Sequence, residues 1–512
     1  MNNRGYVTVF LTLILLAMLG VAATVIKICE FENARTKTST ALSSAMSGEL
    51  ANYDRFIFDR YHILLMDKNA GDAGEGQLEQ SIQDSLQTNL GDEYTVNSVE
   101  LSGVTGILDD DCKEFKRQIN QNFNYQVAEK LVDKIIEKTK GEDEPIDQDT
   151  LDDIDSDIDE KQKLIKDDDS DSDDSEKNND SNNSKNKVDL KKTDDESDGG
   201  KNKDDKSDDS KKTDKKETTK DPRKTLKTYT DAGIASLILP ENVTLSGNVV
   251  DYSNLPSGKK TGNKLQNIGT EFNNLDRMKL DSRKTVGWGT EIVTDVESIS
   301  YAGEYFNCLT EKKYDDTYLN LEMEYIIAGE DTDGGNYKQV VDEILLIRFG
   351  FNMAYIITDS VKMGECATIA AGICWYFPFA EPVVQYLLAG CWAYIESVAD
   401  LYLLVRGHSI PYLKTFDTWM TDFESLGRLS ELSAEETDSE SGLNYKEYLM
   451  ILIALKGKTR YYRMLDIMQM NANMKYNGNY TLKMNNCITA FAINAEVEHK
   501  GLSIEEHEEA GY

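Results

Sequence analysis

The sequence predicts an α+β protein on a membrane anchor: an N-terminal transmembrane helix that continues into a long helix, a small mixed sheet and a large helical core. Three observations lead to this prediction. An uncharged apolar run near the N-terminus is long enough to cross a bilayer. Segments of alternating apolar residues then mix with longer segments of helical periodicity. A highly acidic segment with few apolar residues interrupts this pattern.

The membrane span is predicted from Val7 to Ile28. No charge occurs between Val7 and Ile26, and about 20 apolar residues are enough for a helix to cross a bilayer core. Lys27 closes the run and can extend its ammonium to the interface. The alternatives are a cleaved signal peptide and a buried soluble helix, but the apolar core of a signal is usually shorter, about 7–15 residues.

The orientation of the span follows from few charges. Arg4 and the amino terminus precede it, whereas Lys27, Arg35, Lys37 and two glutamates follow it, so counting charges gives no clear answer. A short tail with a single arginine usually stays inside. We therefore expect residues 1–6 to be a short cytoplasmic tail and the protein to be a single-pass cell-membrane protein, with its large C-terminal domain outside.

Charge and cysteine content narrow the class of protein. The formal net charge is -36 and the pI is near 4.5, which argues against nucleic acid as a partner and against adsorption to anionic lipid. The seven cysteines occur singly, with neither a metal-binding spacing nor an evident disulfide framework. The apolar surroundings of Cys366, Cys374 and Cys391 favour buried thiols.

Residues 29–140 are predicted as a helical stem and a small α+β module. Apolar residues recur every three to four positions after the span, which predicts a helix face that packs on a domain or on a neighbouring copy. These residues are Leu42, Met46, Leu50, Tyr53 and Ile57. Beyond them we predict a strand at Tyr61–Met66, a helix at Leu78–Leu90, a strand at Tyr94–Leu101 and a helix from about Cys112 to Lys140.

Residues 141–221 consist largely of Asp, Glu, Lys, Ser, Asn and Thr. Such a segment cannot bury enough apolar surface to offset its chain entropy, so we predict a disordered acidic linker. Its alternating aspartates, such as Asp169, Asp171 and Asp173, imitate the start of a calcium loop. However, Asp174 stands where an EF-hand turn requires glycine, so we interpret this stretch as a solvated acidic tract.

Residues 222–512 are predicted as a mainly helical domain with a C-terminal strand. Helical segments are expected at Arg223–Ile234, Val293–Leu309, Leu321–Ala328, from Gly335 or Asn336 onward, Gly442–Lys456 and Lys458–Asn473. The alternation over Thr481–Val497 predicts a long strand that returns to the sheet of the N-terminal module.

Two apolar blocks in this domain compete with the N-terminal run as membrane spans. Pro378 ends the block Gly364–Phe379 too early for a crossing. The block Val383–Val405 is long enough but contains Glu396 and Asp400, each of which costs roughly 2.5–3.5 kcal/mol at mid-span. We predict that both blocks are central helices of a soluble core; a membrane-seated hairpin is the alternative.

The chain shows no motif that carries catalysis, a cofactor or a metal. The four histidines lack an HExxH spacing, and a GxSxG elbow is absent. Glu396 and Asp400 lie one helical turn apart, the spacing of a paired-carboxylate site. An enzyme would need both carboxylates open to a cleft; we favour ion pairs with Arg348 or Arg406 in a helical core. We therefore expect no enzymatic activity, no cofactor and no metal site.

The N-terminal residues resemble a known type of protein. Arg4-Gly5, then Thr8-Val9-Phe10-Leu11, then Glu32-x-Ala34-Arg35 resemble the prepilin-like start of TadE- and TadG-like proteins of Tad (tight adherence) pili in Gram-positive Clostridia. The resemblance implies processing between Gly5 and Tyr6. It also implies a glutamate at the fifth mature position, where this chain has Phe10, so a major repeating subunit is not expected.

The rest of the chain resembles an uncharacterised family of unknown function encoded in such Tad-like pilus and secretion clusters. The matching stretches are Glu324-Tyr325-Ile326-Ile327-Ala328-Gly329, Arg348 with Asn352, Trp392-Ala393-Tyr394 with Glu396-Ser397, Tyr445-x-Glu447-Tyr448-Leu449, and Arg463-Met464-x-Asp466. The resemblance implies a minor pilin-like or assembly subunit whose partners are the membrane and other pilus or secretion subunits. The alternative is an envelope binding or sensor module, for which we expect an aromatic pocket near Trp375 and Trp392.

Overall fold

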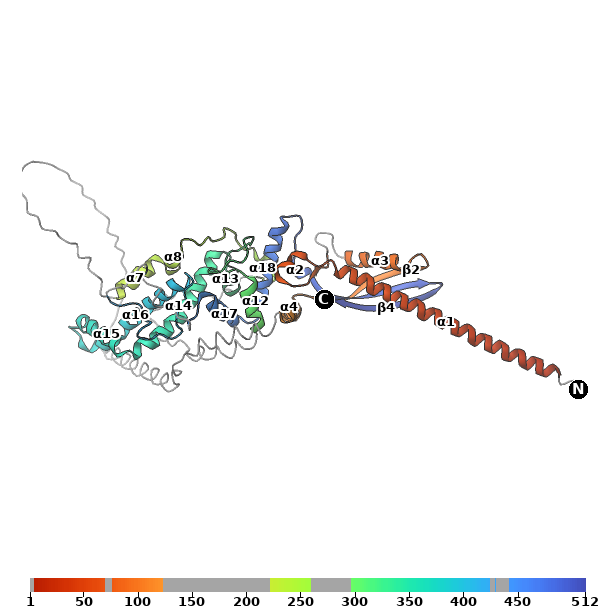
Figure 1. Ribbon diagram of the computed structural model, residues 1–512, viewed down its shortest axis with the longest axis horizontal. Coiled ribbons are helices and arrows are strands. Elements are labelled where there is room, and N and C mark those ends of the chain that lie inside the picture. Colours follow the sequence, from red (N-terminus) through yellow and green to blue (C-terminus); the bar gives the residue numbers. More distant parts are fainter. Residues whose placement is uncertain (1–3, 70–75, 123–221, 259–295, 424–428, 430–441) are drawn as a thin grey trace, which may run out of the picture. The chain divides into compact units, whose positions relative to one another are not determined.

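The structure is a computed structural model that describes residues 4–69, 76–122, 222–258, 296–423, 429 and 442–512. It confirms the α+β fold predicted from the sequence, with a long N-terminal helix, a small sheet and a large helical core (Figure 1). The predicted acidic linker, residues 141–221, lies outside the described residues.

Helix α1 spans Arg4–Leu50 without interruption, so the predicted membrane span and stem form one element (Figure 1). Its apolar half contains threonines whose hydroxyls bond within the helix: the Thr12 hydroxyl donates to the carbonyl oxygen of Val9 and that of Thr24 to Gly20, both at 2.8 Å. These polar groups therefore do not need water, which is compatible with a lipid environment.

The described strands form one antiparallel sheet rather than the mixed sheet predicted from the sequence. Its strands are β1 (Met66–Asp67), β2 (Tyr94–Gly106), β3 (Cys487–His499) and β4 (Leu502–Gly511). Strand β3 pairs with all three others. Lys500 and Gly501 connect β3 to β4 with positive φ angles of 50° and 75°, the conformation that two-residue hairpin turns require.

The second half of α1 and helix α3 (Gln77–Leu90) cover one face of this sheet. Leu42 and Met46 of α1 are fully buried there, as predicted. The predicted apolar stripe is wrong beyond Leu50, because α1 ends at that residue. Ile57 instead belongs to the next helix, α2 (Arg55–Tyr61), and is buried in the helical core.

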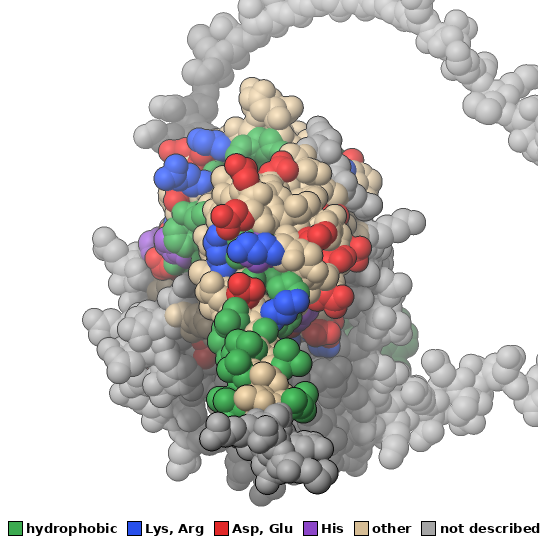
Figure 2. All heavy atoms as spheres, turned by 90° about the vertical axis from the view of Figure 1, so that its right-hand side faces the viewer, with side chains coloured by type: hydrophobic (Ala, Val, Ile, Leu, Met, Phe, Trp, Pro, Cys, Tyr) green, Lys and Arg blue, Asp and Glu red, His purple; other side chains and the backbone are tan. Residues whose placement is uncertain are grey.

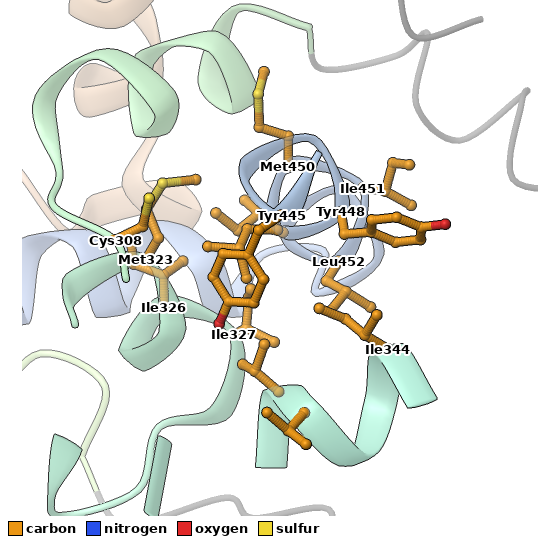
Figure 3. Packing of buried hydrophobic residues seen from close by; sticks show 14 of the residues in the cluster. Cys308, Met323, Ile326, Ile327, Ile344, Tyr445, Tyr448, Met450, Ile451 and Leu452 are labelled. Atoms are coloured by element: carbon orange, nitrogen blue, oxygen red, sulfur yellow. The ribbon is translucent and has the colours of Figure 1, made fainter. Parts of the chain in front are cut away.

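The helical core contains the remaining described α-helices. They are α4 (Asp109–Asn122), α7 (Pro222–Ala232), α8 (Ile234–Ile238), α12 (Val296–Tyr305), α13 (Glu322–Ala328), α14 (Asp333–Thr358), α15 (Ser360–Ile373), α16 (Glu381–Leu404), α17 (Tyr445–Leu455) and α18 (Thr459–Tyr476). Figure 3 shows a part of the packing, where side chains of α17 such as Tyr445 and Leu452 meet Ile327 of α13 and Ile344 of α14. Helix α17 begins with a capping box in which Asn444 and Glu447 bond each other's backbone N–H groups, which explains its start.

The two apolar blocks that were weighed as membrane spans form α15 and α16 in the structure. By length and composition, two described helices suit a membrane crossing: α1 and the helical stretch Pro378–Leu404. In the most apolar 18 residues of Pro378–Leu404, 89% of the residues are buried inside the protein. The prediction of a central core helix is therefore confirmed for α16. It is wrong for most of α15, whose buried residues are Lys362, Cys366 and Ala370 alone among its fourteen.

The predicted strand Tyr61–Met66 is wrong except at its end. Tyr61 is the last residue of α2, and Met66 pairs with Ile488 of β3. Between them the backbone N–H and carbonyl of Leu64 bond the Gln118 side chain, at 2.7 and 2.8 Å. A side-chain amide thus satisfies the groups that a neighbouring strand would otherwise satisfy.

At the C-terminus, the long strand exists and pairs with the N-terminal module as predicted. It begins at Cys487 rather than Thr481, because Met484–Asn486 forms a 3-10 turn. Strand β4 was not predicted, since its glutamate-rich sequence has little β propensity. The described part of the helix predicted from Cys112 to Lys140 is α4, and the remainder lies outside the described residues.

Candidate functional site

The first half of α1 presents a continuous apolar surface. Its large hydrophobic side chains from Val9 to Ile28 are 42–70% exposed, and Figure 2 shows them gathered on the part of α1 that faces the viewer. A helix that is apolar all around and has no protein neighbour is typical of a membrane span or a signal sequence. The structure thus supports an N-terminal membrane anchor or signal at Val7–Ile28.

The predicted processing residues lie at the start of this helix. The backbone of Gly5 and Tyr6 is helical, while the side chains of Tyr6 and Val7 lie outside the described part of the chain. Phe10, which stands where the resemblance implies a glutamate, is 65% exposed on the apolar surface. Its ring is one of the groups that would contact lipid.

The second half of α1 holds the sheet through the residues that follow the span. Ala34 is 1% exposed, so α1 lies close to its neighbours at this position. The Arg35 guanidinium donates to Glu506 of β4 at 2.7 Å, and the Ser39 hydroxyl donates to Glu508 at 2.6 Å. The Glu506 carboxylate and its hydrogen bond raise the pKa of Arg35. Arg35 and Ser39 therefore dock the stem on the C-terminal hairpin.

The proposed paired carboxylates of α16 lie in a fully buried ion network. Asp400 accepts hydrogen bonds from Arg348 at 2.9 Å and from the Asn352 amide at 2.9 Å. Arg348 also donates to the carbonyl oxygens of Pro411 and Tyr412, each at 2.9 Å, which fixes the chain after α16. The predicted pairing with Arg348 is confirmed for Asp400 but not for Glu396, whose cation is Lys414, and Arg406 bonds the carbonyls of Ile238 and Tyr402 instead.

A second cation, Lys414, completes the network and was missed in the sequence. Its ammonium lies 2.8 Å from carboxylate oxygens of both Glu396 and Asp400, and all three side chains are completely buried. Glu396 also accepts bonds from the backbone N–H and hydroxyl of Thr421, at 2.9 and 2.7 Å. Lys414 lies in an irregular segment with no helical periodicity, so no sequence pattern pointed to it.

The network has the electrostatics of a structural element. Two carboxylates face two cations, so its formal charge is zero, and no member is open to solvent. Burial favours the neutral form of Asp400, but Arg348 and Lys414 outweigh it and hold the pKa of this carboxyl below its ordinary value. An acid–base pair needs access to a substrate. The geometry therefore contradicts the hypothesis of an enzyme with Glu396 and Asp400 open to a cleft.

A second buried polar cluster joins α13 and α18. The Tyr325 hydroxyl donates to Asp466 at 2.9 Å, and the Ser257 N–H donates to the other oxygen of this carboxylate at 2.9 Å. Arg463 donates to the carbonyl oxygens of Ile326 and Ile327 at the end of α13. Burial raises the pKa of Asp466 to about 6.

Two further carboxylates of α13 fix the loop before it. Glu322 accepts the Asn307 N–H at 2.7 Å, and Glu324 accepts the Leu309 N–H at 2.9 Å. Burial raises the pKa of each to about 7. Both carboxylates fix backbone N–H groups rather than bind a ligand, because their described contacts lie within the folded core.

The aromatic pocket expected for a binding module is not formed by Trp375 and Trp392. Trp392 is 1% exposed and donates its indole N–H to the Thr421 hydroxyl, whereas Trp375 is 74% exposed. A cavity of about 520 Å³ lies elsewhere, lined by the end of α1, β1, α3 and α18. Its carboxylates Asp54 and Asp67 accept bonds from the hydroxyls of Tyr476 and Tyr480, respectively.

The described part of the chain shows neither a metal-binding cluster nor a disulfide. The described residues contain no group of three or more His, Cys, Asp or Glu side chains arranged to hold a metal ion. The seven cysteines, all within the described ranges, form no disulfide, and Cys366, Cys374 and Cys391 are buried as predicted.

Comparison with known protein families assigns the larger part of the chain. Residues 212–499, more than half of the sequence, match a family described as "Family of unknown function (DUF5702)". The chain belongs to this family. No curated protein and no solved structure matches it. The DUF5702 region begins before α7 and ends with β3, so it includes both buried polar clusters and the central strand of the sheet.

The motifs that carried the resemblance to an uncharacterised family coincide with these clusters. Arg348, Asn352, Glu396, Ser397 and Tyr448 belong to or bond the network of α14 and α16. Four more, Tyr325, Gly329, Arg463 and Asp466, belong to the cluster of α13 and α18 or end α13. These residues of the DUF5702 region therefore maintain its fold.

Proposed function

We propose that this chain is a membrane-anchored, non-enzymatic component of a Tad-like pilus or secretion system, acting as a minor pilin-like or assembly subunit. The proposal rests on one observation: the two halves of the single helix α1 have different surroundings. From Val9 to Ile26 the exposed side chains are apolar or small, while Ala34, Leu42 and Met46 are buried against the protein's own sheet. A lipid-embedded helix that continues rigidly into a folded outer domain is the construction of pilins, which the N-terminal residues resemble.

The non-enzymatic part of the proposal rests on the buried charges. Glu396 and Asp400 are neutralised by Arg348 and Lys414 without access to solvent. Their arrangement stabilises the fold and leaves no free base or nucleophile at that place. We assign the large domain to the outer side of the cell membrane and other pilus or secretion subunits as its partners.

A minor or assembly role fits better than a repeating subunit. Phe10 stands where pilins carry the glutamate that pairs with a neighbouring amino terminus. A phenyl ring cannot form that ion pair. The size of the outer domain supports the same choice, because major Tad pilins are very small.

The proposal is tested by deleting the gene in its host, imaging surface filaments and measuring secreted proteins. We expect loss or shortening of filaments, or reduced secretion, with recovery on complementation by the intact gene. Filaments and secretion that stay unchanged after deletion would refute the role. A secretion ATPase and Tad-type membrane platform genes beside this gene would support it.

Variants of α1 separate anchoring from folding. The double substitution Leu13→Lys and Leu16→Lys places two charges in the span, each costing roughly 2.5–3.5 kcal/mol on an insertion scale, and should remove the protein from the membrane fraction. Val249→Lys is the matched control, because Val249 is 58% exposed outside the span. It should leave fractionation and complementation unchanged.

A further inference from the structure

A second exposed apolar surface lies at the turn between α15 and α16. We call the residues Trp375–Phe379 the aromatic turn. Trp375 and Phe379 are each 74% exposed, Tyr376 is 70% and Phe377 is 58% exposed. Neighbouring rings contact one another, with centroid distances of 4.7 Å for Trp375 and Tyr376 and 5.9 Å for Phe377 and Phe379.

Further exposed apolar residues occur on both helices. Other large hydrophobic residues exposed on this hairpin are Val361, Ile373, Val383 and Leu387. Single exposed hydrophobic residues are ordinary, but a contiguous apolar surface on a folded protein indicates an interaction site. This surface is separate from α1 in the sequence and is not explained by the proposed anchor.

The chemistry of the turn excludes most polar partners. No charged residue occurs between Glu365 and Glu381. The nearby Lys362 is 8% exposed, and its ammonium lies 5.2–5.5 Å from the ring centroids of Trp392, Phe416 and Trp419. The turn therefore offers no exposed charge to which an acidic or basic peptide could pair.

Two backbone N–H groups, those of Phe377 and Ala380, are satisfied within the hairpin. The Phe377 N–H donates to the carbonyl oxygen of Cys374 at 2.8 Å, and the Ala380 N–H donates to that of Phe377 at 3.0 Å. The Thr368 hydroxyl donates to Gly364 of its own helix. Internal satisfaction of polar groups is what a segment needs in order to leave water for hydrocarbon.

We propose that the aromatic turn inserts into the interface of a lipid bilayer. Trp and Tyr prefer the headgroup level of a membrane, and Phe adds affinity by reaching the acyl boundary. The insertion is shallow, because α16 from Leu388 onward is buried in the helical core and cannot follow the turn into lipid.

The bilayer is a second one, not that around α1, and this choice rests on the proposed anchoring of α1. The helix rises about 1.5 Å per residue, so Leu50 lies about 33 Å beyond Ile28, the end of the span. The chain enters α2 and the helical core after this rigid stem. The helical core therefore begins beyond this stem, which leaves its aromatic turn to another lipid surface.

The test uses the full chain held by α1 in nanodiscs of unlabelled lipid. Phosphatidylcholine vesicles with doxyl-labelled acyl chains are then added, and fluorescence is recorded. Subtracting the signal of Trp375→Phe isolates Trp375 from the other three tryptophans of the chain. We expect the vesicles to quench the Trp375 signal, and sodium chloride to leave the quenching unchanged because no ion pair is involved.

Two variants control the vesicle contact. Phe377→Ser combined with Phe379→Ser keeps the Trp375 reporter and should lower co-flotation of loaded nanodiscs with vesicles at least about tenfold, because two exposed rings no longer enter lipid. Val249→Ser, an exposed apolar residue elsewhere, should change nothing. Equal thermal melts of all variants show that each is folded.

Three outcomes overturn the inference: no quenching by vesicles, quenching only when the doxyl lipid is in the nanodisc, or a Trp375 signal that shifts with protein concentration alone. The last outcome identifies a second copy as the partner. Failure of the chain to enter nanodiscs overturns the proposed anchor instead. The two failures are therefore distinguishable.

Discussion

Substitution of Lys414 by methionine tests whether the buried network is an element of stability. The change removes an ammonium that lies 2.8 Å from both Glu396 and Asp400, so that Asp400 keeps its ion pair with Arg348 and the buried Glu396 loses its ion pair. Removing one partner of a buried pair typically costs about 3–5 kcal/mol, because the remaining charge is uncompensated. Methionine is close to the lysine side chain in shape, so little of this cost comes from a cavity.

The free energy of unfolding is measured by urea titration of the detergent-solubilised full chain, followed by tryptophan fluorescence. Trp392 reports locally, since its indole N–H bonds the same Thr421 hydroxyl that donates to Glu396. Lys312→Met is the control: it removes a lysine whose ion pair with Asp315 is exposed, and should leave the midpoint unchanged.

A compensating variant separates charge from packing. Adding Asp400→Asn to Lys414→Met leaves one buried cation and one buried anion. An asparagine at 400 keeps an oxygen for Arg348 and Asn352, which bond the same Oδ2 of Asp400. This double variant should be more stable than Lys414→Met alone by at least about 1 kcal/mol. A loss below about 1 kcal/mol for Lys414→Met, or no recovery in the double variant, would refute the reasoning.

Two further predictions concern α13. Burial raises the pKa of Glu324 to about 7, above its unfolded value of about 4.3. The contribution of Glu324 to the free energy of unfolding is therefore full below pH 4 and is lost as the pH rises through about 7. Glu324→Gln should reduce the fall in the urea midpoint between pH 5 and pH 8, and an unchanged fall would contradict the raised pKa. Gly329 has φ +63°, and a Cβ there would lie 2.5 Å from the Arg463 guanidinium, whereas Gly407 (φ +92°) has open space. Gly407→Ala should cost about 1–2 kcal/mol from conformation alone, and Gly329→Ala should cost more in the same urea assay; equal losses would show that the contact with Arg463 is unimportant.

The helices were predicted well where periodicity is local. The segment Leu78–Leu90 was placed within one residue of α3, because its apolar residues recur every four positions and bury one face. Strand β2 was found from its alternation but extends to Gly106. The segment Tyr61–Met66 shows the limit: its alternation is real, with Tyr61, Ile63 and Leu65 all buried, yet Gln118 replaces the neighbouring strand.

The candidate site was predictable only in part for a similar reason. Asp400 could be paired with Arg348 because both lie on recognisable helices with buried faces. Lys414 lies outside any helix, and its position depends on how the chain returns after α16. The exposed aromatic turn contradicts the core position predicted for Gly364–Phe379, since apolar composition does not reveal whether neighbours cover a segment.

By itself, the sequence determined the apolar span at Val7–Ile28, the helical stem after it and the absence of recognisable catalytic motifs, because length, charge and periodicity are properties of contiguous residues. Tertiary structure alone decided which carboxylates are neutralised and which apolar surfaces remain open. Both depend on side chains brought together from distant positions, such as Lys414 with Asp400 and Arg35 with Glu506. Burial and charge pairing are set by these neighbours, and a linear pattern does not contain them.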